Sequence, residues 1–140
     1  MSLPLGGLAL LIVLAMKFLA GEVAAQPARV DCGHEASTPE INFCFEQELE
    51  REDAALNRVY QAAMKETQHN DFMSAADRKN WANALRDAQR KWIAFRDADC
   101  RDLTGYEWFG GTGASGAALI CLIDKTRART KELTERYDAR

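Results

Sequence analysis

Apolar residues recur every three or four positions along three stretches of this chain, and this spacing predicts three amphipathic helices. The clearest stretch lies near residues 75–103, where no glycine or proline interrupts the pattern. Its stripe consists of Trp81, Leu85, Ala88, Trp92 and Phe95. Ser74 and Asp77 have a capping-box-like spacing at its start. Two tryptophans on one face need apolar partners, so we expect this helix to pack inside a bundle.

Two further helices are predicted on either side of this one. The first lies near residues 38–66 and starts with Ser37 and Glu40 at capping-box spacing. The third lies near residues 118–138. Their stripes are Ile41, Phe45, Leu49, Leu56, Tyr60 and Ala63 in the first, and Leu119, Leu122, Thr126, Arg129, Leu133 and Tyr137 in the third. A short polar connection at residues 67–73 favours an antiparallel arrangement of the first two helices.

These patterns predict an all-α protein, a three-helix antiparallel bundle made of a helical hairpin and a third helix. The expected core consists of Trp81, Leu85, Trp92, Phe95, Leu56, Tyr60, Leu122 and Leu133. Asp53, Asn57 and Arg129 interrupt the apolar stripes of facing helices. They could form a catalytic group or a buried hydrogen-bond network that fixes how the helices register. No nucleophile, histidine or metal ligand accompanies them, so we interpret them as a structural polar network and predict no enzymatic activity.

The helical pattern breaks at residues 104–116, where five of thirteen residues are glycines. Glycine at this density costs too much backbone entropy for a helix, so a loop is predicted. Large aromatic residues on a surface loop either cover the core or meet a partner. We predict that Tyr106, Glu107 and Trp108 contact a protein partner, with Glu107 suited to a basic surface. Phe109 is expected to fold back onto the open end of the bundle, and for Trp108 both positions remain open.

The start of the chain has the features of an export signal. Residues 3–15 form an apolar run that small residues follow at 23–25, although no Lys or Arg precedes the run. Thirteen residues at about 1.5 Å each are too short for a hydrocarbon core of about 30 Å, which disfavours an uncleaved anchor. We therefore predict a signal peptide at 1–25 and a single helical domain at 26–140. The mature protein is expected in the periplasm or outside the cell, with no membrane association.

Composition narrows the functional classes. The chain has 140 residues, of which 47% are hydrophobic and 28% charged, and this suits one compact domain. Its net charge of −3 at pH 7 disfavours a nucleic-acid partner, because phosphate recognition needs a basic surface. The Cys-x-x-Cys-His motif of a haem site is absent, and we expect no cofactor.

Four cysteines, Cys32, Cys44, Cys100 and Cys121, remain in the predicted mature chain. An even number in a small exported protein most simply forms two disulfides. The intervening segments of 11, 55 and 20 residues lack the short spacing of a metal site. The pairing stays open between Cys32–Cys44 with Cys100–Cys121 and Cys44–Cys100 with Cys32–Cys121. We favour the first, because Cys100 ends one predicted helix and Cys121 starts the next at the same end of the bundle.

The order and spacing of several short motifs add a family resemblance. These motifs are Cys32, Thr38-Pro39-Glu40, Cys44, Asp53, Leu56-Asn57, Tyr60, Gln89-Arg90-Lys91-Trp92-Ile93, Arg96-Asp97-Ala98-Asp99-Cys100, Gly110-Gly111-Thr112, Cys121-Leu122, Thr126, Arg129 and Leu133. In them the chain resembles the LprI-like family of small exported bacterial proteins, named for a lysozyme inhibitor. The resemblance implies a helical, disulfide-stapled domain of the periplasm or cell envelope, without enzymatic activity, that binds a lysozyme-like hydrolase. The alternative is an envelope scaffold or assembly module with a different protein partner.

Overall fold

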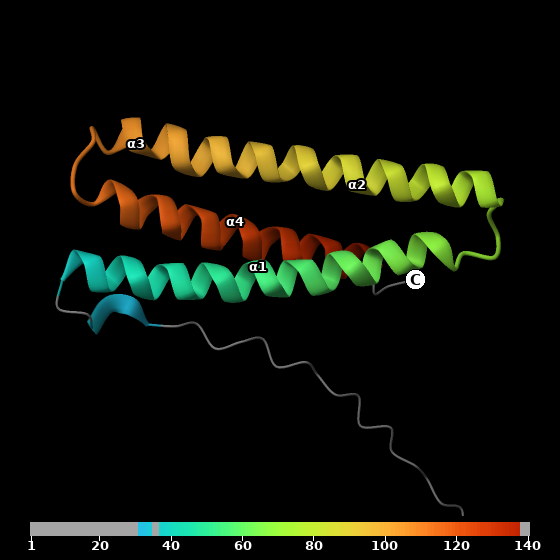
Figure 1. The fold of residues 1–140 in the computed structure, drawn as a ribbon, viewed down its shortest axis with the longest axis horizontal. Helices are drawn as coiled ribbons and strands as arrows, with labels where there is room; N and C mark the ends of the chain where they lie inside the picture. Colours follow the sequence, from blue (N-terminus) through green and yellow to red (C-terminus); the bar gives the residue numbers. More distant parts are fainter. Residues whose placement is uncertain (1–30, 35–36, 138–140) are drawn as a thin grey trace, which may run out of the picture.

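The computed structural model describes residues 31–34 and 37–137 (Figure 1). Within these ranges every regular element is helical, and the predicted all-α class is confirmed. The elements in chain order are η1 (Cys32–His34), α1 (Thr38–Gln68), α2 (Ala75–Asp97), the π-helix η2 (Ala98–Leu103), α3 (Thr104–Glu107) and α4 (Ala114–Tyr137). No helix in the described part of the chain has the length and apolarity that a membrane span requires. The predicted signal peptide lies outside the described residues.

Side chains that the sequence singled out lie at the starts of the first two long helices. At the start of α2, Ser74 Oγ accepts a hydrogen bond from the Asp77 N–H at 3.1 Å and donates one to the Asp77 carboxylate at 2.7 Å. At the start of α1, Ser37 Oγ donates to the Glu40 carboxylate at 2.7 Å. Pro39 lies in the first turn of α1, where its missing N–H costs no hydrogen bond. The Ser74 side chain is an N-terminal cap, which contributes about 1 kcal/mol, whereas the Ser37 side chain makes no capping hydrogen bond to the α1 backbone.

The three long helices form an up-down-up bundle. The chain turns after α1, so that α2 runs antiparallel to it, and turns again, so that α4 runs parallel to α1 (Figure 1). The most extensive packing joins α1 to α4. Leu122, Thr126 and Leu133 of α4 are completely buried, and Ala63 of α1 is as well. α1 and α4 therefore form the main interface, and α2 packs against both helices, more extensively against α1.

The apolar core lies where the side chains of the three long helices meet. Its buried members are Leu56, Ala63, Leu85, Leu133 and Tyr137, and partly buried residues around it are Val59, Tyr60, Met64, Trp81 and Trp92. Burying a large apolar side chain contributes about 1.5–3 kcal/mol. The rings of Trp81 and Tyr137 stack with their centroids 6.2 Å apart and join α2 to the end of α4. Except for Phe95, the predicted core residues are buried or partly buried.

The prediction that Phe95 belongs to the core is wrong, because this residue is 57% exposed. The buried stripe of α2 consists of Ala82, Leu85, Gln89 and Arg96. Ala88 and Phe95 lie at the edge of that stripe and face solvent. Arg96 takes the inward position, since its guanidinium finds hydrogen-bond acceptors there. The ring of Phe95 instead lies 5.0 Å from the Lys125 ammonium, a cation–π contact at the surface.

The predicted loop at 104–116 is shorter in the structure. Helical backbone continues through η2 and α3 to Glu107, and α4 begins at Ala114 rather than near residue 118. Gly116 lies within α4, where a Cβ would come 3.3 Å from Asn42 Oδ1 of α1. Glycine at this position lets the two helices approach closely. The glycines of this segment therefore serve helix packing as well as the turn.

Candidate partner-binding site

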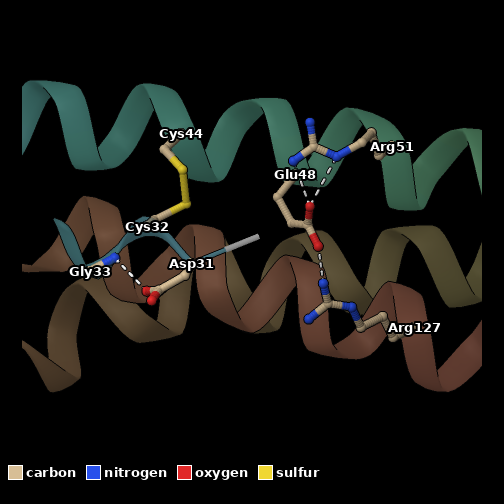
Figure 2. The surroundings of a disulfide bond; sticks show 7 residues. All are labelled: Asp31, Cys32, Gly33, Cys44, Glu48, Arg51 and Arg127. Carbon is tan, nitrogen blue, oxygen red and sulfur yellow. Dashed lines mark hydrogen bonds and ion pairs between the residues drawn. A yellow bond between two sulfur atoms is a disulfide. The ribbon is translucent and has the colours of Figure 1, made fainter. Parts of the chain in front are cut away.

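Two disulfides fix the end of the bundle at which α1 and α4 begin. Cys32 pairs with Cys44 (Figure 2), and Cys100 pairs with Cys121, with Cα–Cα distances of 5.8 and 5.4 Å. This is the local pairing that the sequence favoured. The first bond ties η1 to α1, and the second ties η2 to α4. The connection between α3 and α4 is therefore closed at its base by a covalent bond.

The second disulfide forms part of a cluster of residues whose types can bind metal ions. Ligand atoms of Asp99, Cys100 and Cys121 lie within 4.8 Å of one another. Metal coordination by cysteine needs thiolates, and both sulfurs are bonded to each other here. The Asp99 carboxylate instead forms an ion pair with Lys125 at 2.9 Å. We assign this cluster a structural role in joining η2 to α4.

Two buried glutamates of α1 form a polar centre within the α1–α4 interface. Glu48 and Glu52 are each 5% exposed. The Arg127 guanidinium of α4 donates from Nε to Glu52 at 2.7 Å and from Nη2 to Glu48. Figure 2 shows Glu48 between Arg127 and Arg51, which donates to the same glutamate at 2.6 and 3.0 Å. Because each buried charge has a hydrogen-bonded partner, this centre fixes the register of α1 against α4.

A second polar centre joins all three long helices through Arg96. The Arg96 guanidinium donates to Asp53 of α1 at 2.7 Å, to Thr126 of α4 at 2.9 Å and to Asp97 at 2.9 Å. It also lies 5.3 Å from the centroid of the Trp92 ring. Arg96 is 8% exposed. Its charged side chain therefore occupies an inward position of the bundle at which the periodicity had suggested an apolar residue.

The predicted network of Asp53, Asn57 and Arg129 is not one group in the structure. Asp53 belongs to the Arg96 centre, whereas Arg129 donates to Gln89 of α2 at 3.1 Å. Arg129 also donates to Glu132 at 2.7 Å. Asn57 is exposed, because its position on α1 faces away from both contacts. Sequence analysis missed Glu48, Glu52, Arg96 and Arg127, and the signal that could have found Arg96 is its spacing of seven residues from Gln89 along α2.

The end of the molecule at which α1 and α4 begin carries exposed aromatic residues in α3 and the turn after it. We name Tyr106, Glu107, Trp108 and Phe109 the aromatic tip. Tyr106, Trp108 and Phe109 are 81%, 50% and 97% exposed, and Glu107 is also exposed. The tip lies at the end of the molecule, at the connection of α3 with α4 (Figure 1). The structure thus brings together the three residues predicted to contact a partner and adds Phe109 to them.

The expectation that Phe109 folds back onto the bundle is wrong, and the backbone explains why. Phe109 has φ 51° and Gly110 has φ 66°, so two successive residues adopt the left-handed conformation. This turn directs the Phe109 side chain into solvent. Trp108 folds the other way, against Gly113, where a Cβ would come 2.5 Å from its ring. Trp108 is therefore half covered, between the two positions that the sequence left open.

Backbone hydrogen bonds hold the aromatic tip in one conformation. The N–H groups of Phe109, Gly110 and Gly111 donate to the carbonyls of Tyr106, Gly105 and Trp108 at 3.0, 3.1 and 2.8 Å. A groove of about 630 Å³ opens beside the tip. Its apolar lining consists of Ile41, Phe45, Leu103, Trp108, Ala117 and Ile120. The tip and the groove form a continuous surface through Trp108, which belongs to both.

The fold and this surface define a small, disulfide-stapled helical domain that presents a preorganised aromatic tip. A family model described as lysozyme inhibitor LprI matches residues 31–133, and the chain belongs to this family. The chain is also 37% identical over 114 residues to an uncharacterised protein of Rhizobium meliloti. The aligned region covers 79% of this chain and 81% of that protein. No solved structure matches the chain. The name of the family denotes inhibition, an activity of binding rather than of catalysis.

Proposed function

We propose that this protein is exported to the periplasm or the cell surface and inhibits a lysozyme-like hydrolase by binding to it. Membership of the LprI family supports the inhibitory role. The apolar run at residues 3–15 supports export, and so do the two disulfides, which persist in oxidising compartments. Inhibition by binding requires a contact surface and no catalytic residue on this chain.

The observation that carries the proposal is the exposure of the aromatic tip. Tyrosine and tryptophan are enriched among the anchors of protein interfaces, and the tip presents both beside a phenylalanine. Its backbone is already ordered by hydrogen bonds, so binding costs little further conformational entropy. Glu107 adds a negative charge that complements a basic lysozyme-like surface. A narrow tip at the end of a bundle can also enter a concave substrate cleft, as inhibition requires.

The test is a cell-wall lysis assay with c-type, g-type and i-type lysozymes, read as the loss of turbidity. We expect the protein to slow at least one of the three enzymes. The double variant Tyr106→Ala with Glu107→Ala should weaken inhibition about tenfold or more, because it removes an anchor and a charge. Its matched control is Asp71→Ala with Phe72→Ala, which removes an exposed carboxylate and a fully exposed ring at the opposite end of the bundle.

Each result decides a separate part of the proposal. No inhibition of any lysozyme type would contradict the inhibitory function and leave the envelope-scaffold alternative. Inhibition that the two double variants weaken equally would contradict the aromatic tip as the contact site. Thermal melting of both variants must match the parent, so that lost inhibition is not lost folding.

A further inference from the structure

A second hollow lies against the aromatic tip and is lined by residues other than those of the groove. Its volume is about 690 Å³, and its lining consists of Asp102, Gly105, Tyr106, Phe109 and Gly110. Two of these residues are the most exposed aromatics of the tip, and two are glycines without side chains. A Cβ built on Gly105 or Gly110 would meet no atom within 4 Å, so the space above both glycines is open.

The polar side-chain groups in this hollow are the Asp102 carboxylate, which accepts hydrogen bonds, and the Tyr106 hydroxyl, which accepts or donates. The N–H groups of Phe109 and Gly110 donate to carbonyls within the turn and cannot serve a ligand. Asp102 is exposed and forms no salt bridge with another residue in the described ranges. What the hollow offers is a free carboxylate, a phenol oxygen and the faces of two aromatic rings. A ligand that complements these groups carries positive charge and hydrogen-bond donors.

The backbone at Phe109 points to the same conclusion. A bulky residue reaches φ 51° only at an energetic cost, and Gly or Asn would adopt this conformation more easily. The ring of Phe109 is 97% exposed, so it gains no core packing in return. The cost is explained if the ring at this position contacts a ligand.

We propose that the hollow is a cation-binding clamp that takes an arginine side chain of the protein partner. Arginine fits better than a neutral sugar, because its planar guanidinium stacks on aromatic rings and donates paired hydrogen bonds to a carboxylate. The rings of Tyr106 and Phe109 contact the guanidinium, and Asp102 balances its charge. The inference rests on the proposed function for its partner, since a basic lysozyme-like surface would supply the arginine.

The clamp is tested with peptides rather than with an enzyme. The probes are acetyl-Gly-Arg-Gly-amide and acetyl-Gly-citrulline-Gly-amide, which differ in charge and hardly in shape. Titrated into the ¹⁵N-labelled oxidised protein, the arginine peptide should cause saturable shifts of the Gly105 and Gly110 amide signals. The citrulline peptide should bind at least about fivefold more weakly, because it lacks the charge that the carboxylate and rings recognise.

Three variants define the clamp. Asp102→Asn and Phe109→Asn should each weaken the arginine peptide about two- to fivefold. Phe109→Asn should do so without lowering the melting temperature, because asparagine tolerates the left-handed conformation. Gly105→Ala places a methyl group in open space within a helical turn, so the melting temperature of this variant should equal or exceed that of the parent. The added methyl group should also reduce the volume of the hollow. Phe72→Asn, at the other end of the bundle, is the control and should bind the peptide like the parent.

The outcomes separate this inference from the proposed function. Equal binding of the two peptides, or shifts confined to other residues, would overturn the clamp even if the protein inhibits lysozyme. Shifts of the Gly105 and Gly110 signals by N-acetylglucosamine trimer, with none by the arginine peptide, would overturn it in favour of a sugar site. Selective binding of the arginine peptide by a protein that inhibits no lysozyme would support the clamp and contradict the proposed function alone.

Discussion

Replacing Arg127 by methionine tests whether the charged centre between α1 and α4 holds the bundle in register. The Glu52 side chain is 7% exposed and its ion pair is with Arg127, whereas Glu48 keeps Arg51 as a second partner. Leaving a buried charge without its partner costs about 3–5 kcal/mol. Because the Arg127 side chain is 25% exposed, water can reach the vacated space, and we expect about 2–4 kcal/mol. This corresponds to a fall in melting temperature on the order of 10–25 °C.

The measurement is urea unfolding of the oxidised protein followed by circular dichroism. Arg136→Met on the same helix is the control, because Arg136 and its partner Glu132 are about half exposed and the pair should contribute less than about 1 kcal/mol. Adding Glu52→Gln to Arg127→Met should recover part of the loss, because the unpaired charge is then removed. A loss no larger than that of the Arg136 control, or a double variant less stable than Arg127→Met, would refute the reasoning.

Two further predictions concern the end of the bundle that carries the aromatic tip. Replacing Cys100 and Cys121 by serine opens a 22-residue loop and should cost about 3 kcal/mol on the chain-entropy estimate, and an unchanged urea midpoint would contradict it. Gly113→Ala places a Cβ where the Trp108 ring lies, so the ring must swing outward. The tryptophan emission should shift to the red with a stability loss of about 1 kcal/mol, and an emission spectrum like the parent's would show that the ring does not pack there.

The helical periodicity predicted the fold well, because three long segments bury one continuous face each. From Leu122 to Tyr137 every member of the predicted stripe of α4 is buried, polar members included, and Ile123 is buried in addition. The periodicity failed at Phe95 and Arg96, which are neighbours on the helix. Counting apolar residues favours Phe95, whereas burial of Arg96 depends on acceptors that only α1 and α4 supply. Such a choice depends on tertiary partners and cannot be made from α2 alone.

The aromatic tip shows a different limit of sequence reasoning. Its glycines correctly indicated an irregular connection, but the position of Phe109 depends on the left-handed backbone at residues 109 and 110. A phenylalanine gives no local signal for this conformation, because it adopts it rarely. Sequence analysis also did not predict the polar centre of Glu48, Glu52 and Arg127, for a related reason. Its members lie on two helices far apart in the chain, so no single stretch contains the pattern.

The central claim is that the aromatic tip touches a lysozyme, and site-specific photo-crosslinking tests it most directly. A benzoyl-phenylalanine replaces Phe109 in one protein and Phe72 in another, since both rings are almost fully exposed. Phe109 lies in the connection of α3 with α4 and Phe72 in that of α1 with α2, and these two connections are at opposite ends of the bundle (Figure 1). Irradiated with the lysozyme that the protein inhibits, the substitution at position 109 should give a covalent complex and that at position 72 should not. A complex formed from position 72, with none from position 109, would contradict the account.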